Sequence, residues 1–481
     1  MGALSFFDRS RIVAKPGFSR WLVPPAALSI HLAIGQAYAF SVFKKPLNYL
    51  IQVHSVGGGL KALPVSMDSP NPLDWTFPDL AWIFILAIVF LGLSAAVFGK
   101  WLERVGPRKA MFASAVCFGS GFFISALGVQ IHQLWLIYIG YGVIGGTGLG
   151  IGYISPVSTL IKWFPDRPGM ATGMAIMGFG GGALIGSPLA RNLMDHFRTN
   201  NDLGVMKTFL VMGAIYFVAM MFGVITVRIP APGWKPEGWT APAKPKALVT
   251  THDVEVNRAS GTPQFWLVWI VLCMNVSAGI GILEQASPMI QELFKGRITA
   301  VAAAGFVALL SLFNMGGRFI WSTVSDYIGR KNTYFVFFIL GGILYYLAPR
   351  TGSSGLNSVP LFVAVAAVIV SMYGGGFATV PAYLKDLFGT MEVGAIHGRL
   401  LTAWSVAGIV GPWLVNHIRE YEKNHGVPLA DSYSAVLYVM VGLLIIGLIA
   451  NAMVRPVNSK YWYQTQATDS AAVSGTAVVR S

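Results

Sequence analysis

The chain has 481 residues, of which 54% are hydrophobic and only 11% are charged, and its formal net charge is +14. Soluble domains carry about 25% charged residues, so this composition excludes an ordinary soluble protein and indicates a polytopic membrane protein. The surplus of lysine and arginine is then explained by basic cytoplasmic loops, and no nucleic-acid partner is expected. The two cysteines give neither a disulfide framework nor a metal site.

Twelve apolar runs are long enough to cross a lipid bilayer, which takes about 20 residues of helix. Six are predicted at residues 21–43, 80–98, 109–129, 134–162, 169–190 and 207–228. Six more are predicted at residues 264–290, 300–324, 332–349, 359–383, 394–418 and 433–454. The expected fold is therefore an all-α integral membrane protein with twelve transmembrane helices in two six-helix bundles.

The polar stretches divide this chain into five parts. A cytoplasmic N-terminus (1–20) precedes the first bundle (21–228), which contains a long extracytoplasmic loop (44–79). A Pro-rich cytoplasmic linker (229–263) leads to the second bundle (264–455) and a cytoplasmic tail (456–481). With both termini inside, lysine and arginine are about twice as frequent on the cytoplasmic side, as the positive-inside rule requires.

The two halves are predicted to be a repeat. At an offset of 223 or 224 residues, Glu103 falls on Asp326 and Tyr153 falls on Phe377, and further pairs follow in order. Parallel repeats of six helices predict a binding site near the middle of the membrane, between the two halves.

Two charged residues inside the predicted spans are candidates for function. Arg318, in span 300–324, is costly in a membrane and is by default functional. Its planar guanidinium can bind a carboxylate through two hydrogen bonds. The alternative is a structural role near the inner end of that span. Glu284, in span 264–290, is a candidate for proton coupling, and the alternative is that it faces water at the external mouth.

The stretch GKWLERVGPRK (Gly99 to Lys109) and its repeat SDYIGRK resemble the loop motif of the major facilitator superfamily. The resemblance implies a conformational latch, in which an acid at a helix end pairs with arginines on the facing loop. The residues of this latch would be Gly99, Glu103, Arg104, Gly106, Arg108, Asp326, Gly329 and Arg330. Glu103 stands where the motif usually has aspartate.

Longer stretches, among them GQAYAFSVFKKPL from Gly35 and YGGGFATVPAYLKDLFGT from Tyr373, resemble the oxalate/formate antiporter family. This bacterial family is related to monocarboxylate transporters. The resemblance implies alternating-access transport of a small carboxylate anion, by antiport or proton symport, across the bacterial cytoplasmic membrane. We expect a monomer that is not an enzyme and that needs no cofactor or metal.

The same resemblance implies roles for individual residues. Asn314 and Arg318 match the N-x-x-G-R context of the family's arginine, and Asn314 stands where animal-type relatives have an aspartate, which argues against proton coupling through that pair. Members that handle oxalate have a lysine in the span corresponding to 394–418. Trp404 stands at or near that place, and the span has no lysine, which argues against a doubly charged substrate.

Aromatic residues are expected to line the cavity of the family fold. Tyr38, Tyr153, Tyr373, Phe377 and Trp404 would exclude water and donate hydrogen bonds to a small carboxylate. Core packing or interfacial anchoring is the alternative for each. The favoured function is a carrier of a monocarboxylate such as formate, pyruvate or lactate. Oxalate/formate exchange proper and a transporter-like carboxylate sensor stay open as alternatives.

Overall fold

The computed structural model describes residues 6–48, 50, 75–199, 202–240, 248–352 and 355–464. Within these residues the regular structure is helical, apart from two isolated bridges. Eleven helices are long and apolar enough to cross a membrane, and a bent pair of helices near the N-terminus brings the number to as many as twelve. The predicted all-α fold is thus confirmed, and the number of spans agrees with the prediction.

Each predicted span corresponds to one helix or to a short series of helices. The first half contains α1 (Val23–Ile34), the 3-10 helix η4 (Gly35–Ala39), α2 (Ser41–Asn48), α4 (Phe77–Val105), α5 (Pro107–Gln130), α6 (Leu134–Ile137), the π-helix η6 (Tyr138–Gly145), α7 (Gly146–Trp163), α8 (Pro168–Phe197) and α9 (Val205–Thr226). The second half contains α10 (Val256–Ala259), α11 (Pro263–Leu293), α12 (Ala300–Ile328), α13 (Arg330–Leu347), α14 (Val359–Phe388), α15 (Val393–Leu400), α16 (Thr402–Asn424) and α17 (Leu429–Met453).

The predicted loop at 44–79 is too long at both ends. Helix α2 continues to Asn48, because Phe43 and Leu47 are buried one turn apart while Lys45 is exposed, so the lysine lies on an amphipathic helix. Helix α4 begins at Phe77, where the side chain of Thr76 caps its first turn. Residues 49 and 51–74 of the predicted loop lie outside the described residues.

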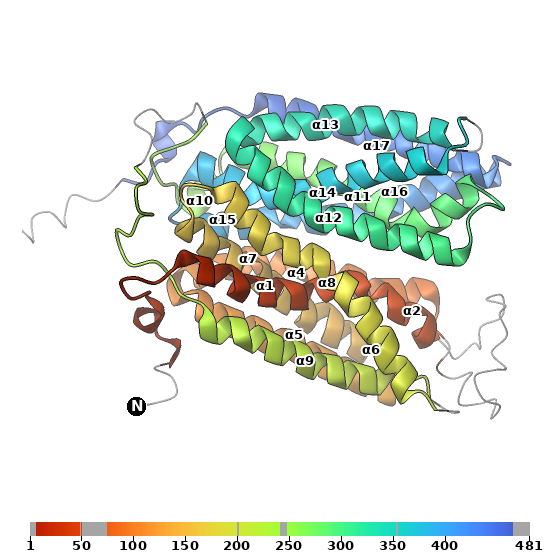
Figure 1. The fold of residues 1–481 in the computed structure, drawn as a ribbon, viewed down its shortest axis with the longest axis horizontal. Helices are drawn as coiled ribbons and strands as arrows, with labels where there is room; N and C mark the ends of the chain where they lie inside the picture. Colours follow the sequence, from red (N-terminus) through yellow and green to blue (C-terminus); the bar gives the residue numbers. More distant parts are fainter. Residues whose placement is uncertain are drawn as a thin grey trace, which may run out of the picture.

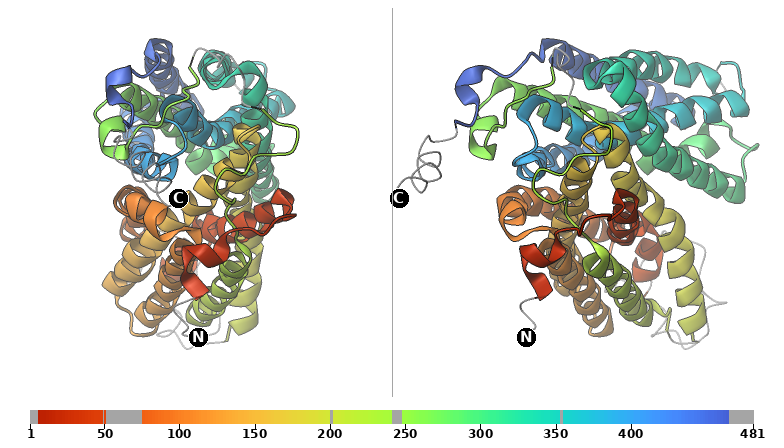
Figure 2. Two further views of the ribbon diagram at one scale, coloured as in Figure 1. Left: turned by 90° about the vertical axis from the view of Figure 1, so that its left-hand side faces the viewer. Right: turned by 60° about the vertical axis from the view of Figure 1, so that its left-hand side comes forward.

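The helices form two groups that meet along a central interface. Figure 1 shows the first half, red to yellow-green, below the second half, green to blue, with α8 and α12 between them. Helix α8 packs against α12 and α14, and α4 packs against α15 and α16. Residues 227–240, after α9, lie against the first group, and residues 248–262, before α11, lie against the second. Both stretches are at one end of the helices (Figure 2), which we call the linker end.

The turns between α4 and α5 and between α12 and α13 have the same geometry. Gly106 and Gly329 each have a φ of +86°, a conformation that glycine adopts without strain. Each ends one long helix and begins the next at the linker end. The two halves of the predicted repeat therefore reverse direction in the same way at matching positions.

Close contact between α12 and α14 depends on one of two adjacent glycines. A Cβ atom on Gly317 would lie 2.1 Å from the backbone oxygen of Ser371, whereas a Cβ on Gly316 would have no heavy atom within 4 Å. Packing against α14 therefore requires glycine at position 317 and not at position 316.

We predict that Gly317→Ala lowers the melting temperature of the purified protein in detergent and that Gly316→Ala does not. Overpacking of this kind costs about 1–3 kcal/mol, whereas removing an unneeded helical glycine stabilises by about 1 kcal/mol. Thermal unfolding followed by tryptophan fluorescence measures both variants. Equal melting temperatures would contradict the contact between the two helices.

Candidate functional site

Arg318 lies well inside α12, at the interface with the first half. Its side chain is fully buried, and Nη1 donates a hydrogen bond to the backbone oxygen of Ile176 on α8, at 3.4 Å. Nε donates to Oδ1 of Asn314 one turn earlier, at 3.1 Å. A Cβ atom on Gly180 would lie 2.9 Å from Nε, so the glycine lets the guanidinium lie directly against α8. The arginine therefore faces the opposite half of the molecule and is not at the end of its helix.

Aromatic rings from both halves surround this guanidinium. Its central carbon lies 5.2 Å from the ring centre of Phe377 on α14 and 5.6 Å from that of Phe179 on α8. Trp404 on α16 contacts both phenylalanines, with ring centres 4.5 Å and 5.3 Å away. Tyr153 on α7 lies 5.4 Å from the same tryptophan. Cation–π attraction to such rings partly compensates a buried guanidinium for the loss of water.

Two tyrosines join the halves at this cluster. The hydroxyls of Tyr38 on η4 and Tyr373 on α14 are 3.3 Å apart and form a hydrogen bond. The ring of Tyr38 packs against Phe179 at 5.1 Å, and that of Tyr373 packs against Phe377 at 5.3 Å. Tyr38 is only partly buried, whereas the other five rings of the cluster are buried. This hydrogen bond therefore connects η4 of the first half to α14 of the second half at the edge of the aromatic cluster.

Three buried donors in this cluster have no hydrogen-bond partner. They are Nη2 of Arg318, the hydroxyl of Tyr153 and Nε1 of Trp404, and they come from three different helices. An unsatisfied buried donor costs about 1–3 kcal/mol, and a charged one costs more. A ligand rich in acceptors and carrying one negative charge would satisfy these groups, since a carboxylate has two acceptor oxygens.

The structure brings the seven predicted substrate-binding residues into one cluster. Phe179 was not among them, although it contacts the guanidinium and three of the predicted aromatic residues. The sequence feature that could have identified Phe179 is its position as a single large ring within the glycine-rich run of α8. Asn314 accepts a hydrogen bond from Arg318, so it orients the guanidinium without neutralising it. Glu284 belongs to α11, but its side chain lies outside the part of the chain that the structure describes.

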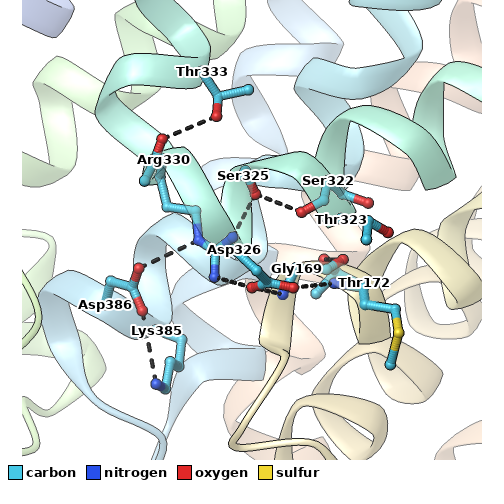
Figure 3. Close-up of polar contacts among 12 residues, drawn as sticks. Gly169, Thr172, Ser322, Thr323, Ser325, Asp326, Arg330, Thr333, Lys385 and Asp386 are labelled. Carbon is cyan, nitrogen blue, oxygen red and sulfur yellow. Dashed lines mark hydrogen bonds and ion pairs between the residues drawn. The ribbon is translucent and has the colours of Figure 1, made fainter. Parts of the chain in front are cut away.

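A second polar cluster joins the halves at the linker end. Asp326, in the last turn of α12, accepts hydrogen bonds from the backbone N–H groups of Gly169 and Met170, at 2.9 Å and 2.8 Å (Figure 3). These groups belong to the first turn of α8, where the helix dipole favours a negative charge. Arg330 donates to Asp326 at 2.5 Å and also pairs with Asp386 on α14 at 3.3 Å. The carboxylate is thus held by a helix end of the other half and by an arginine of its own half.

Glu103 makes the corresponding contact from the first half. Its Oε1 accepts from the backbone N–H of Gly394 in the first turn of α15, at 3.1 Å, and from the hydroxyl of Ser158, at 2.8 Å. Lys162 donates to Oε2 at 2.5 Å. A Cβ on Gly99 would lie 2.7 Å from Cα of Ala395, so α4 and α15 also touch through their backbones.

The expectation that arginines pair with both acids is wrong for the first half. Arg108 donates to the backbone oxygens of Val224 and Ile225 at the end of α9, at 3.1 Å and 3.2 Å, and Arg104 is exposed. The last carbonyls of a helix lack partners within that helix, and Arg108 satisfies two of them. The nearby Lys162 occupies the place next to Glu103 instead.

Comparison with protein families finds a match to the Major Facilitator Superfamily over residues 18–412. The chain belongs to this family. It is therefore a membrane transporter, and its two halves correspond to the architecture of such carriers. The fucose:proton symporter FucP of E. coli has the same fold, with a TM-score of 0.60 over 90% of this chain and 99% of that structure, at 11% identity.

Two curated relatives of this transporter cover most of its length. The uncharacterized transporter YhjX of Escherichia coli is 27% identical over 81% of this chain and 86% of its own length. The oxalate:formate antiporter of Oxalobacter formigenes is 28% identical over 65% of this chain and 69% of its own length. The second relative is consistent with the resemblance that the sequence motifs indicated.

We predict that Asp326→Asn opens the linker end of the transporter. The neutral amide loses the charge that attracts the first turn of α8 and Arg330, so the contact between the halves weakens. The reporter is a cysteine that replaces Thr172, in a protein whose two native cysteines are changed by Cys117→Ser and Cys273→Ser. Thr172 is a buried residue of α8, and its hydroxyl donates to the backbone oxygen of Ala378 in the other half. Its labelling by a hydrophilic maleimide should accelerate several-fold.

The matched control is Asp195→Asn, which changes an exposed carboxylate near the opposite end of α8. It should leave the labelling rate unchanged. Equal rates for the Asp326 and Asp195 variants would show that the carboxylate does not hold the two halves together.

Proposed function

We propose that this transporter carries a small monocarboxylate, such as formate, pyruvate or lactate, by alternating access, with Arg318 as the anchor for the anion. The observation that supports this proposal most directly is the buried guanidinium with a free Nη2 donor at the interface of the halves. Among the side chains that the structure describes, no carboxylate forms an ion pair with it. The substrate would supply the missing negative charge.

The chemistry of the surrounding groups limits the class of substrate. A carboxylate next to Arg318 would accept from Nη2 and from the unpartnered donors of Tyr153 and Trp404. The phenylalanine rings would exclude water and leave an apolar surface for a short aliphatic group. Arg318 is the cation in this cluster, so one negative charge is balanced and a second would not be. This supports a monocarboxylate over a dicarboxylate.

The transport cycle follows from the contacts between the halves. Binding of the anion neutralises Arg318, which lowers the cost of enclosing the site in a medium of low dielectric constant. Rocking of the halves would break the contacts of Glu103 and Asp326 at the linker end and expose the site there. The basic loops at this end support a cytoplasmic orientation of the linker and termini. The bacterial relatives support a location in a bacterial inner membrane.

We predict that Arg318→Ala lowers the uptake of radiolabelled pyruvate or formate into proteoliposomes by about ten- to 150-fold. Hydrogen bonds to charged groups contribute about 1.5–3 kcal/mol, and 1.4 kcal/mol corresponds to a factor of ten. Arg318→Lys should retain part of the activity, because it keeps the charge and loses the two-pronged geometry.

The control for this measurement is Arg350→Ala, which removes an exposed arginine just after α13, in the 3-10 helix Ala348–Thr351. Its uptake should equal that of the unmodified protein. Full uptake by the Arg318→Ala protein would exclude this guanidinium from substrate binding.

We further predict that Trp404→Lys widens the substrate range towards dicarboxylates. A lysine at this place would put a second positive charge in the cluster, and oxalate could then balance both cations. Oxalate should compete with pyruvate uptake in the lysine variant, and not in Trp404→Gln, which opens the same space without a charge. Similar competition in both variants would show that size, and not charge, sets the preference.

A further inference from the structure

Two buried histidines from opposite halves lie on either side of Tyr153. His31 on α1 and His397 on α15 are 0% and 1% exposed. The ring centres are 5.3 Å apart between His31 and Tyr153 and 5.8 Å apart between Tyr153 and His397. Both histidines are therefore next to a residue of the candidate anion site, yet that site does not use them.

Three of the four imidazole nitrogens have no hydrogen-bond partner. Nδ1 of His31 lies 3.2 Å from the backbone oxygen of Ala27 and can donate to it. In the neutral ring this donor leaves the Nε2 lone pair free, and Nε2 has no partner. Neither nitrogen of His397 has one. Buried polar atoms are rarely left in this condition without a functional reason, and a lone pair on imidazole accepts a proton.

The two histidines lie between the anion site and the linker end. His31 precedes Tyr38 by seven residues and His397 precedes Trp404 by seven residues, which is about two helical turns in each case. Gly394, whose N–H is bound by Glu103, is one turn further towards the linker end. A proton held by the pair would be released when the halves separate at that end.

We propose that His31 and His397 together form a proton-binding site, which takes up one proton with each carboxylate and releases it towards the linker end. This inference rests on the proposed function. The stoichiometry is electroneutral, because one positive and one negative charge move together. A second proton is disfavoured, because two imidazolium ions would repel each other across Tyr153.

Electrostatics couples this site to the anion site. The charge of Arg318 acts on His31, and His31 acts on His397. When the guanidinium is unpaired, a proton on the histidines adds a second positive charge to a buried region. A carboxylate bound to Arg318 offsets that charge, so each ligand increases the affinity for the other by the same factor.

Other charged groups on the packed helices are occupied elsewhere. At the linker end, Lys100 pairs with Glu392, Glu103 pairs with Lys162, and Lys385 pairs with Asp386. Among the described residues, the remaining titratable or charged side chains on α15 and on elements packed against α1 and α15 lie in four places. They are Tyr38 and Tyr373 at the anion site, Arg20, Arg104, Arg258, Tyr383 and Arg399 near the linker end, Tyr216 and Cys273 midway along their helices, and Asp79, Arg191, Asp195, His196, Lys207, Glu292, His417, Arg419, Glu420, Tyr421, Glu422 and Lys423 towards the opposite end. Of the charged groups on other helices, Arg318 is the one whose charge acts on His31.

The test uses the full chain in proteoliposomes with radiolabelled pyruvate and formate. The variants are His31→Asn, whose amide can still donate to Ala27, and His397→Gln. The matched control is His417→Gln, which changes an exposed histidine on α16. Two rates are measured for each protein: exchange of labelled for unlabelled substrate without a pH gradient, and uptake driven by an inward proton gradient, with an entrapped pH dye to record proton entry.

The unmodified protein and the His417 variant should show gradient-driven accumulation together with substrate-dependent proton entry. The His31 and His397 variants should keep exchange within about twofold, which also shows that they fold, and should lose at least 90% of both gradient-driven signals. Gradient-driven accumulation and proton entry at the unmodified level in both variants would overturn the proposal.

Three other results would also overturn it, and the first two separate it from the proposed function. If the unmodified protein exchanges carboxylates but shows no proton entry, the proton site is wrong and the carboxylate carrier stands. If the unmodified protein transports neither probe and neither binds to it, the proposed function fails and the proton site fails with it. Loss of exchange in both histidine variants would assign the pair to anion binding instead.

Discussion

The structure is organised around a buried guanidinium at the interface of two helix bundles, with which none of the described carboxylates forms an ion pair. Moving an arginine to the centre of a membrane helix costs about 2.5–3.5 kcal/mol on insertion scales, and Arg318 is fully buried with one donor unused. The carbonyl of Ile176, the amide of Asn314 and the faces of two phenylalanines offset part of this cost. None of them carries a negative charge, so these contacts leave the positive charge of the guanidinium unbalanced.

The contacts at the linker end show how the halves can close around that charge. Glu103 and Asp326 each bind the first turn of a helix in the opposite half, and each lies at the end of a long helix of its own half. Both contacts combine a carboxylate with a helix dipole, which is favourable when the ends touch and is lost completely when they part. Such contacts favour two discrete states and make intermediate openings costly.

The glycines of α8 connect the two clusters. Gly173 and Gly180 lie directly against α12, where a Cβ atom would meet Ser322 and Arg318. The same face of α8 therefore packs beside the guanidinium and, two turns on, beside the latch around Asp326. A tilt of α8 against α12 would change both environments at once, so the surroundings of Arg318 and the closure of the linker end depend on one interface.

The sequence by itself determined the number of spans and the presence of a charge, Arg318, inside one of them, because hydrophobic length and the position of a charge within it are local properties. Matching motifs also indicated which aromatic residues would meet. Only the tertiary structure showed that Phe179 completes the cluster, that His31 and His397 lie on either side of Tyr153, and that Lys162 and not Arg108 pairs with Glu103. Those facts depend on how helices far apart in the sequence are oriented against each other, and the hydrophobic periodicity of a single helix does not determine that orientation.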